Sequence, residues 1–137
     1  MNQTELLEKY KVQSLQYFEN ALSSIEAGDA EKAGEFVWGS MAEALKAVAA
    51  KKEIRLWRHQ DIDDYAKSLA KELGEEEISK AHGLASSLHS NFYEAGLRIE
   101  DVRLRLDQIK DTIRRLLELA TAEESGKGEL NGQGNNI

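Results

Sequence analysis

The chain contains neither cysteine nor proline among its 137 residues. Without cysteine it forms no disulfide and offers no thiolate for catalysis or metal binding. Without proline it lacks the strongest helix breaker. Residues 1–10 have neither the basic segment nor the apolar core of a signal peptide, and no apolar run is long enough to cross a bilayer. We therefore expect a cytoplasmic protein without a membrane span.

Aromatic residues make up only 7% of the chain, and Leu, Ala, Glu and Lys recur at helical spacing. Eighteen Lys and Arg against 25 Asp and Glu give a net charge of −7, which disfavours nonspecific association with nucleic acid or an anionic membrane. The sequence predicts an all-α, up-and-down bundle of about five helices over residues 1–124. Residues 125–137 contain almost no apolar side chain and are expected to form a flexible polar tail.

Apolar side chains recur at steps of three and four in five segments, which place the helices. The segments are approximately residues 4–27, 29–50, 61–74, 75–96 and 99–120. Thr4 and Asp29 are placed to cap the first two helices, and Asp61 is placed to begin the third. Trp38 lies off the main apolar stripe of its helix, so it either covers a second interface, which we favour, or lies half exposed.

Two histidines interrupt the regular pattern of the fourth segment. His82 and His89 are seven positions apart, so both lie at the solvent-facing edge of one apolar stripe. They are candidates for acid and base catalysis on a phosphodiester, because imidazole changes charge near neutral pH. Asn91 and Tyr93 are suited to reading and stacking on a base in the same cleft. The alternative is histidine packing at an interface beside an ordinary polar helix end.

Residues 51–60 form a basic stretch with interleaved aromatic side chains. Arg55, Trp57 and Arg58 are candidate ligand-binding residues, because cations beside a stacking ring suit single-stranded RNA or a nucleotide. The alternative, which we favour, is a solvated connector held to the core by its apolar side chains.

The sequence gives no reason to expect a metal or cofactor. Asp61, Asp63 and Asp64 crowd together, but acidic side chains commonly begin helices. His82 and His89 are too far apart for a shared zinc, since helical ligands usually lie three or four residues apart. No nucleophile elbow or phosphate-binding glycine loop is present.

Three segments carry a resemblance to a known family. They are the first helix with its Gly28–Asp29 restart, the alanine-rich MAEALKAVAA (41–50), and LHSNFYEAGLRIEDV (88–102). Through them, most of residues 4–120 resembles the archaeal PaREP family, which is placed with the HEPN-like (higher eukaryote and prokaryote nucleotide-binding) bundles. The resemblance implies a helical bundle that frequently forms homodimers. In the wider superfamily it also implies a cleft that binds nucleotides or cuts RNA.

The superfamily's ribonuclease motif is an arginine followed, after four to six residues, by a histidine. His89 fits the histidine, but the three positions open to the arginine hold His82, Gly83 and Leu84. The preferred hypothesis is therefore a homodimeric binding module for a nucleotide, RNA or another protein. One alternative is a metal-independent endoribonuclease or toxin that uses His89, and another is a purely structural assembly protein.

Overall fold

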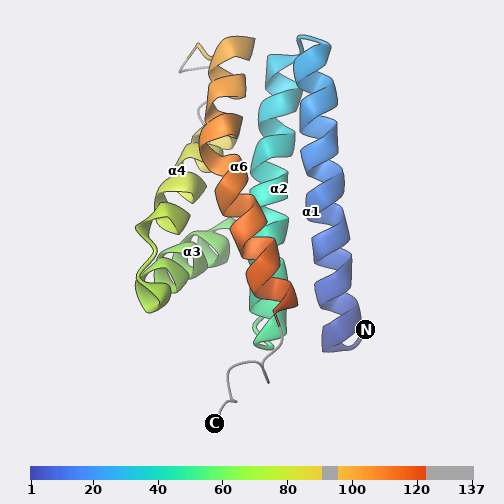
Figure 1. Cartoon of the computed structure of the whole chain (residues 1–137), viewed down its shortest axis with the longest axis vertical. Helices are drawn as coiled ribbons and strands as arrows, with labels where there is room; N and C mark the ends of the chain where they lie inside the picture. The colour runs from blue at the N-terminus through green and yellow to red at the C-terminus, as the bar shows by residue number, and fades with distance from the viewer. Residues whose placement is uncertain (91–95, 123–137) are drawn as a thin grey trace.

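The computed structural model describes residues 1–90 and 96–122. These residues form the helices α1 (Gln3–Glu26), α2 (Ala30–Lys51), α3 (His59–Leu73), α4 (Glu76–Ser90) and α6 (Ile99–Thr121) (Figure 1). The predicted all-α bundle is confirmed. The expected tail falls in residues 123–137, which lie outside the described residues.

Helix α2 is the central element of the bundle, because it contacts α1, α3, α4 and α6. The short α3 and α4 lie on one side of it, while α1 stands beside it on the other (Figure 1). In the described part of the chain, no helix combines the length and apolar character needed to span a bilayer.

The predicted apolar stripes form the core. Residues at three- and four-residue spacing are buried along two helices, and Ile99 at the start of α6 is half-buried. They are Ala33, Val37, Ser40, Met41, Ala44, Leu45 and Val48 of α2 and Val102, Leu106, Ile109, Ile113, Leu116 and Ala120 of α6. The larger fully buried side chains come from α2, α3, α4 and α6: Met41, Leu45, Leu69, Ile78, Leu88, Ile109 and Leu116. The spacing of apolar residues in the sequence therefore identified the buried faces of α2 and α6.

Two helix starts differ from the sequence expectation. Asn2, not Thr4, caps α1: its side chain accepts from the amide of Glu5 at 2.8 Å, and the Glu5 carboxylate accepts from the Asn2 amide at 3.0 Å. Helix α3 begins at His59, because Asp61 in its first turn reaches back to amides that precede the helix. Asp29 caps α2 as predicted, by accepting from the Lys32 amide.

Small residues line part of the α1–α2 contact. Ser14 Oγ donates to the Ser40 carbonyl at 2.8 Å, and Ser40 Oγ donates to the Ser14 carbonyl at 2.9 Å. Both serines are fully buried. Next to them, the Tyr17 ring packs directly over Gly39, where an added Cβ would lie 2.9 Å from a ring carbon. The absence of a side chain at position 39 therefore leaves room for the Tyr17 ring against α2.

We expect Gly39→Ala to destabilise the protein by about 1–3 kcal/mol, because the new methyl group displaces the Tyr17 ring in a packed interface. The matched control is Gly83→Ala, at an exposed position of α4 where an added Cβ meets no atom within 4 Å. That change should stabilise the protein by about 0.5–1 kcal/mol through helix propensity. Urea unfolding of both variants measures the difference, and equal effects would contradict the close-contact explanation.

Candidate functional site

The two histidines of α4 do not share one groove. His82 packs against α3, and His89 packs against α2 and the start of α3. Each imidazole meets a carboxylate from another helix, Asp63 in the first case and Glu35 in the second. The predicted pair is thus two separate imidazole–carboxylate contacts on one helix.

His82 is buried, with only 6% of its surface exposed. The prediction that it lies at the solvent-facing edge of the apolar stripe was therefore wrong. Helix α3 covers it, and its Nε2 lies 2.7 Å from Asp63 Oδ1. Its Nδ1 is enclosed and has no hydrogen-bond partner among the described residues. This arrangement favours donation from Nε2–H to Asp63, because Nδ1 has no partner to receive a proton of its own.

A polar cleft of about 280 Å³ opens between α3 and α4 next to His82. Its lining comprises Asp63, Lys67, Ser79, His82, Gly83, Ser86 and Ser87. Ser87 also accepts a hydrogen bond from the guanidinium of Arg105 on α6. The cleft therefore presents hydroxyls and one lysine beside an imidazole that is already paired.

His89 belongs to a cluster of three rings contributed by three helices. Its ring stacks on Trp38 of α2, with centroids 4.4 Å apart and an interplanar angle of 17°. His59, at the start of α3, meets His89 edge-on at 5.0 Å and Trp38 at 4.8 Å. His89 Nδ1 lies 3.0 Å from Glu35 Oε1. We call Glu35, Trp38, His59 and His89 the ring cluster.

Only part of the ring cluster was predictable from the sequence. His89 was a candidate, and Trp38 was expected to cover a second interface, which it does by contacting α3 and α4. His59 and Glu35 were missed as site residues, because nothing in the local sequence brings positions 35, 59 and 89 together. Asn91 and Tyr93 lie outside the described residues.

The basic residues of the connector between α2 and α3, within residues 51–60, make contacts with other parts of the same chain. Lys51 Nζ donates to carbonyl groups at the end of α6, at Leu119 and Ala122, and Lys52 pairs with Glu72 at 3.1 Å. Arg55 lies over the Trp57 ring, 4.7 Å from its centroid. These contacts favour the connector interpretation.

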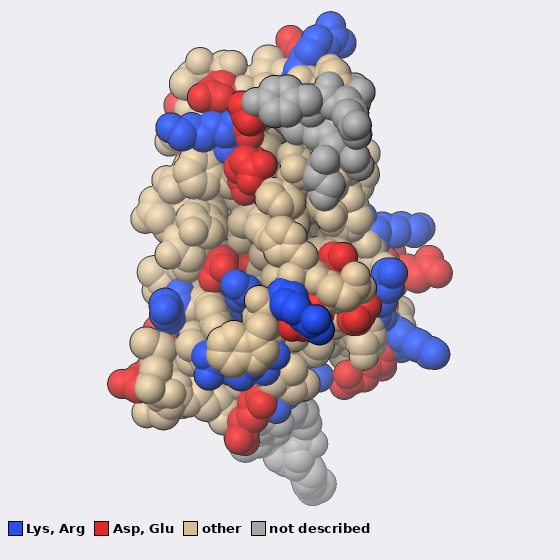
Figure 2. Space-filling view, turned by 180° about the vertical axis from the view of Figure 1, so that it is seen from behind, with Lys and Arg blue, Asp and Glu red and all other residues tan. Residues whose placement is uncertain are grey.

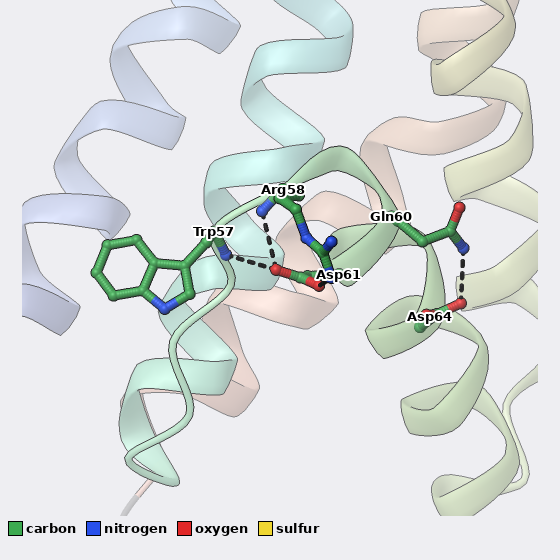
Figure 3. Close-up of polar contacts among 5 residues, drawn as sticks. All are labelled: Trp57, Arg58, Gln60, Asp61 and Asp64. Atoms are coloured by element: carbon green, nitrogen blue, oxygen red, sulfur yellow. Dashed lines mark hydrogen bonds and ion pairs between the residues drawn. The ribbon is translucent and has the colours of Figure 1, made fainter.

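Arg58 is held by the start of α3 (Figure 3). Asp61 accepts from the backbone amides of Trp57 and Arg58, each at 2.9 Å, and from the Arg58 guanidinium at 3.2 Å. The hydrogen bonds from the Arg58 and Trp57 amides lower the pKa of the Asp61 carboxyl below its usual value. The Trp57 indole points away from this contact and is 74% exposed.

The three clustered aspartates point to three different partners. Asp61 caps the start of α3, and Asp64 accepts from the Gln60 side chain at 2.9 Å (Figure 3). Asp63 pairs with His82. Across the described ranges, 1–90 and 96–122, no group of three or more His, Cys, Asp or Glu could hold a metal ion. On the face shown in Figure 2, Lys and Arg side chains are interspersed with Asp and Glu.

A second enclosed polar atom lies on α3. The Tyr65 hydroxyl has no hydrogen-bond partner within the described part of the chain. Burial, and to a lesser degree the charge of Glu72, raises the pKa of Tyr65 to about 12. The folded chain therefore strongly prefers the neutral phenol.

The fold defines an all-α bundle protein arranged around one central helix. The model of the archaeal PaREP1/PaREP8 family matches residues 9–113, and the chain belongs to this family. A crystal structure of a protein from Sulfolobus solfataricus is similar, with a TM-score of 0.64 and 22% sequence identity. The match covers 79% of this chain and 92% of that one, and it supports the fold. Comparison with curated proteins gave no match.

Tyr65→Phe should remove an alkaline sensitivity of the fold. Because the folded-state pKa of Tyr65 exceeds the usual value of 10, ionisation favours unfolding, and stability is lost as the pH rises from 10 towards about 12. The variant lacks this ionisation and an unpaired hydroxyl, so at pH 8 it should match or exceed the wild type. Urea unfolding at pH 8 and pH 11 tests this, and an equal loss in both proteins would contradict it.

Reversing Arg55 and Arg58 to Glu tests the connector as a ligand site. Because both guanidiniums already have intramolecular partners, we expect affinity for short single-stranded RNA to fall no more than the general charge change produces. The matched control is Arg98→Glu with Arg103→Glu, a double reversal on exposed residues at the start of α6. A selective loss in the Arg55 and Arg58 variant would restore the ligand-binding interpretation.

Proposed function

We propose that this PaREP-family chain is a homodimeric, HEPN-like binding module for a nucleotide or a short single-stranded RNA, and that the ring cluster is its ligand site. The observation that carries the proposal is the meeting of Trp38, His59 and His89 at the surface, 4.4 to 5.0 Å apart. Rings from three helices converge there, so the site exists only in the folded chain.

The chemistry of the cluster suits base recognition. His59 is exposed, and Trp38 and His89 are half-buried, so part of the ring surface remains open to a ligand. Bases stack on such rings regardless of sequence, and each stacking contact is worth about 1–3 kcal/mol. Glu35 fixes one nitrogen of His89 and leaves the other directed away from the carboxylate, where it can meet a polar edge of a base.

The negative net charge of the chain limits which ligands it can bind. A net charge of −7 opposes long polyanions, and the connector cations are engaged within the molecule. Stacking must then supply most of the affinity, which favours a mononucleotide or a few unpaired bases over duplex nucleic acid.

Apolar side chains exposed along α1 support the homodimer, since isolated chains rarely expose such a stripe without a partner.

The second candidate is an endoribonuclease or toxin that uses His89. An imidazole held through Nδ1 by a carboxylate has its Nε2 available for proton transfer, and Glu35 provides that contact. The arginine expected at positions 82–84 is absent. Arg105 reaches α4 at Ser87, but residues two apart on a helix lie on different sides, so its guanidinium does not take that role beside His89.

Binding of labelled mononucleotides and a short single-stranded RNA to the full chain tests the proposal, with solution mass measured in parallel. His59→Ala and His89→Ala should each weaken binding about tenfold, because each removes one stacking surface. The matched control is His82→Ala, which removes the other α4 histidine outside the cluster and should leave affinity unchanged. Circular dichroism confirms that each variant is folded.

Each outcome identifies one hypothesis. Equal affinity of all three variants would overturn the ring cluster as the ligand site. A dimer that binds none of these ligands would support the structural assembly protein instead. RNA cleavage by purified protein that His89→Ala abolishes would establish the ribonuclease.

A further inference from the structure

An apolar face on α1 is left exposed by the described residues, 1–90 and 96–122. Val12, Leu15 and Leu22 are 56%, 49% and 41% exposed, although α1 buries its opposite side against α2. At 100° per residue these three positions fall within about 80° of arc, so they form one stripe along the helix. Glu19 falls within the same arc, so the three apolar side chains surround one acidic position.

The stripe borders a groove between α1 and α6 of about 420 Å³. Leu15 and Phe18 of α1 and Ile113 and Leu117 of α6 supply its apolar lining. Leu117 is only partly buried against the core. We call the stripe and the groove together the α1–α6 face.

Charged side chains edge the groove in a regular order. Lys11 and Glu19 stand on α1, four residues on either side of Leu15, and Lys110 and Glu118 stand on α6, four residues on either side of Arg114. The two helices run in opposite directions (Figure 1). Lys11 and Glu118 therefore lie towards one end of the groove, and Glu19 and Lys110 lie towards the other.

From this order we infer that the α1–α6 face is where two copies of the chain meet around a two-fold axis, an inference that rests on the proposed homodimer. An axis perpendicular to the helices places Lys11 opposite Glu19 of the second copy and Lys110 opposite its Glu118. An axis parallel to the helices places Lys11 opposite Glu118 of the second copy and Glu19 opposite its Lys110. Both arrangements join opposite charges around apolar contacts, as a self-complementary interface requires.

The same pattern argues against other occupants. The edges carry both signs in nearly equal number, so they do not form the basic surface that a phosphate backbone needs. Arg114, between the two lysine–glutamate ends, is paired with Asp111 at 2.9 Å. A second copy of the chain carries the same lysines and glutamates, so it can place an opposite charge against each of them.

Sedimentation of the full chain over a range of concentrations tests the inference. Leu15→Glu places a charge in the apolar centre and should raise the dimer dissociation constant at least about tenfold. The matched control is Leu104→Glu, also on an exposed leucine of the bundle but outside the groove, which should leave the constant unchanged. Circular dichroism and ligand binding establish that both variants remain folded.

Charge reversal then identifies the arrangement. Lys11→Glu should weaken the dimer about tenfold. Adding Glu19→Lys restores it if the axis is perpendicular to the helices, and adding Glu118→Lys restores it if the axis is parallel to them. Restoration by either double variant supports the inference, while restoration by neither overturns it.

The remaining outcomes separate this inference from the proposed function. If the wild type is a dimer and Leu15→Glu leaves it intact, the homodimer stands but its interface is not the α1–α6 face. A wild-type chain that stays monomeric at every concentration would overturn both the face and the homodimer, whereas nucleotide binding at the ring cluster is measured independently of mass.

Discussion

The close contact between α1 and α2 determines where the other parts of the bundle lie. Gly39 and the Ser14–Ser40 hydrogen bonds allow the two backbones to approach, and the Tyr17 ring fills the space above the glycine. Because one side of α2 is thereby occupied by α1, its remaining sides receive α3, α4 and α6. A larger side chain in this contact disturbs the helix that every other helix touches.

The ring cluster depends on that central helix. Glu35 and Trp38 lie on α2 one helical turn apart, and they approach His89 from the side that α1 does not cover. His59 completes the cluster because α3 begins at that residue, where Asp61 binds the preceding amides. A hydrogen bond at the start of a short helix thus determines the position of a ring in the candidate site.

The fold could be predicted from the sequence much more fully than the site. Apolar periodicity identified the buried faces of α2 and α6, since burial depends on local spacing along one helix. The burial of His82 could not be predicted in this way, because it depends on how α3 lies across α4. The same holds for the meeting of His59 with His89, which are 30 positions apart and come together only through tertiary packing.

The two tryptophans occupy contrasting surroundings: Trp57 is largely exposed, whereas Trp38 rests against an imidazole. The fluorescence of each tryptophan therefore responds to a different step of unfolding. In a chain that keeps only Trp38, fluorescence follows the docking of α3 and α4 onto α2, while circular dichroism follows the total helix content. If the Trp38 fluorescence changes before the helix content is lost, the antiparallel α1–α2 pair outlasts the rest of the bundle. This small protein would then unfold in two cooperative units.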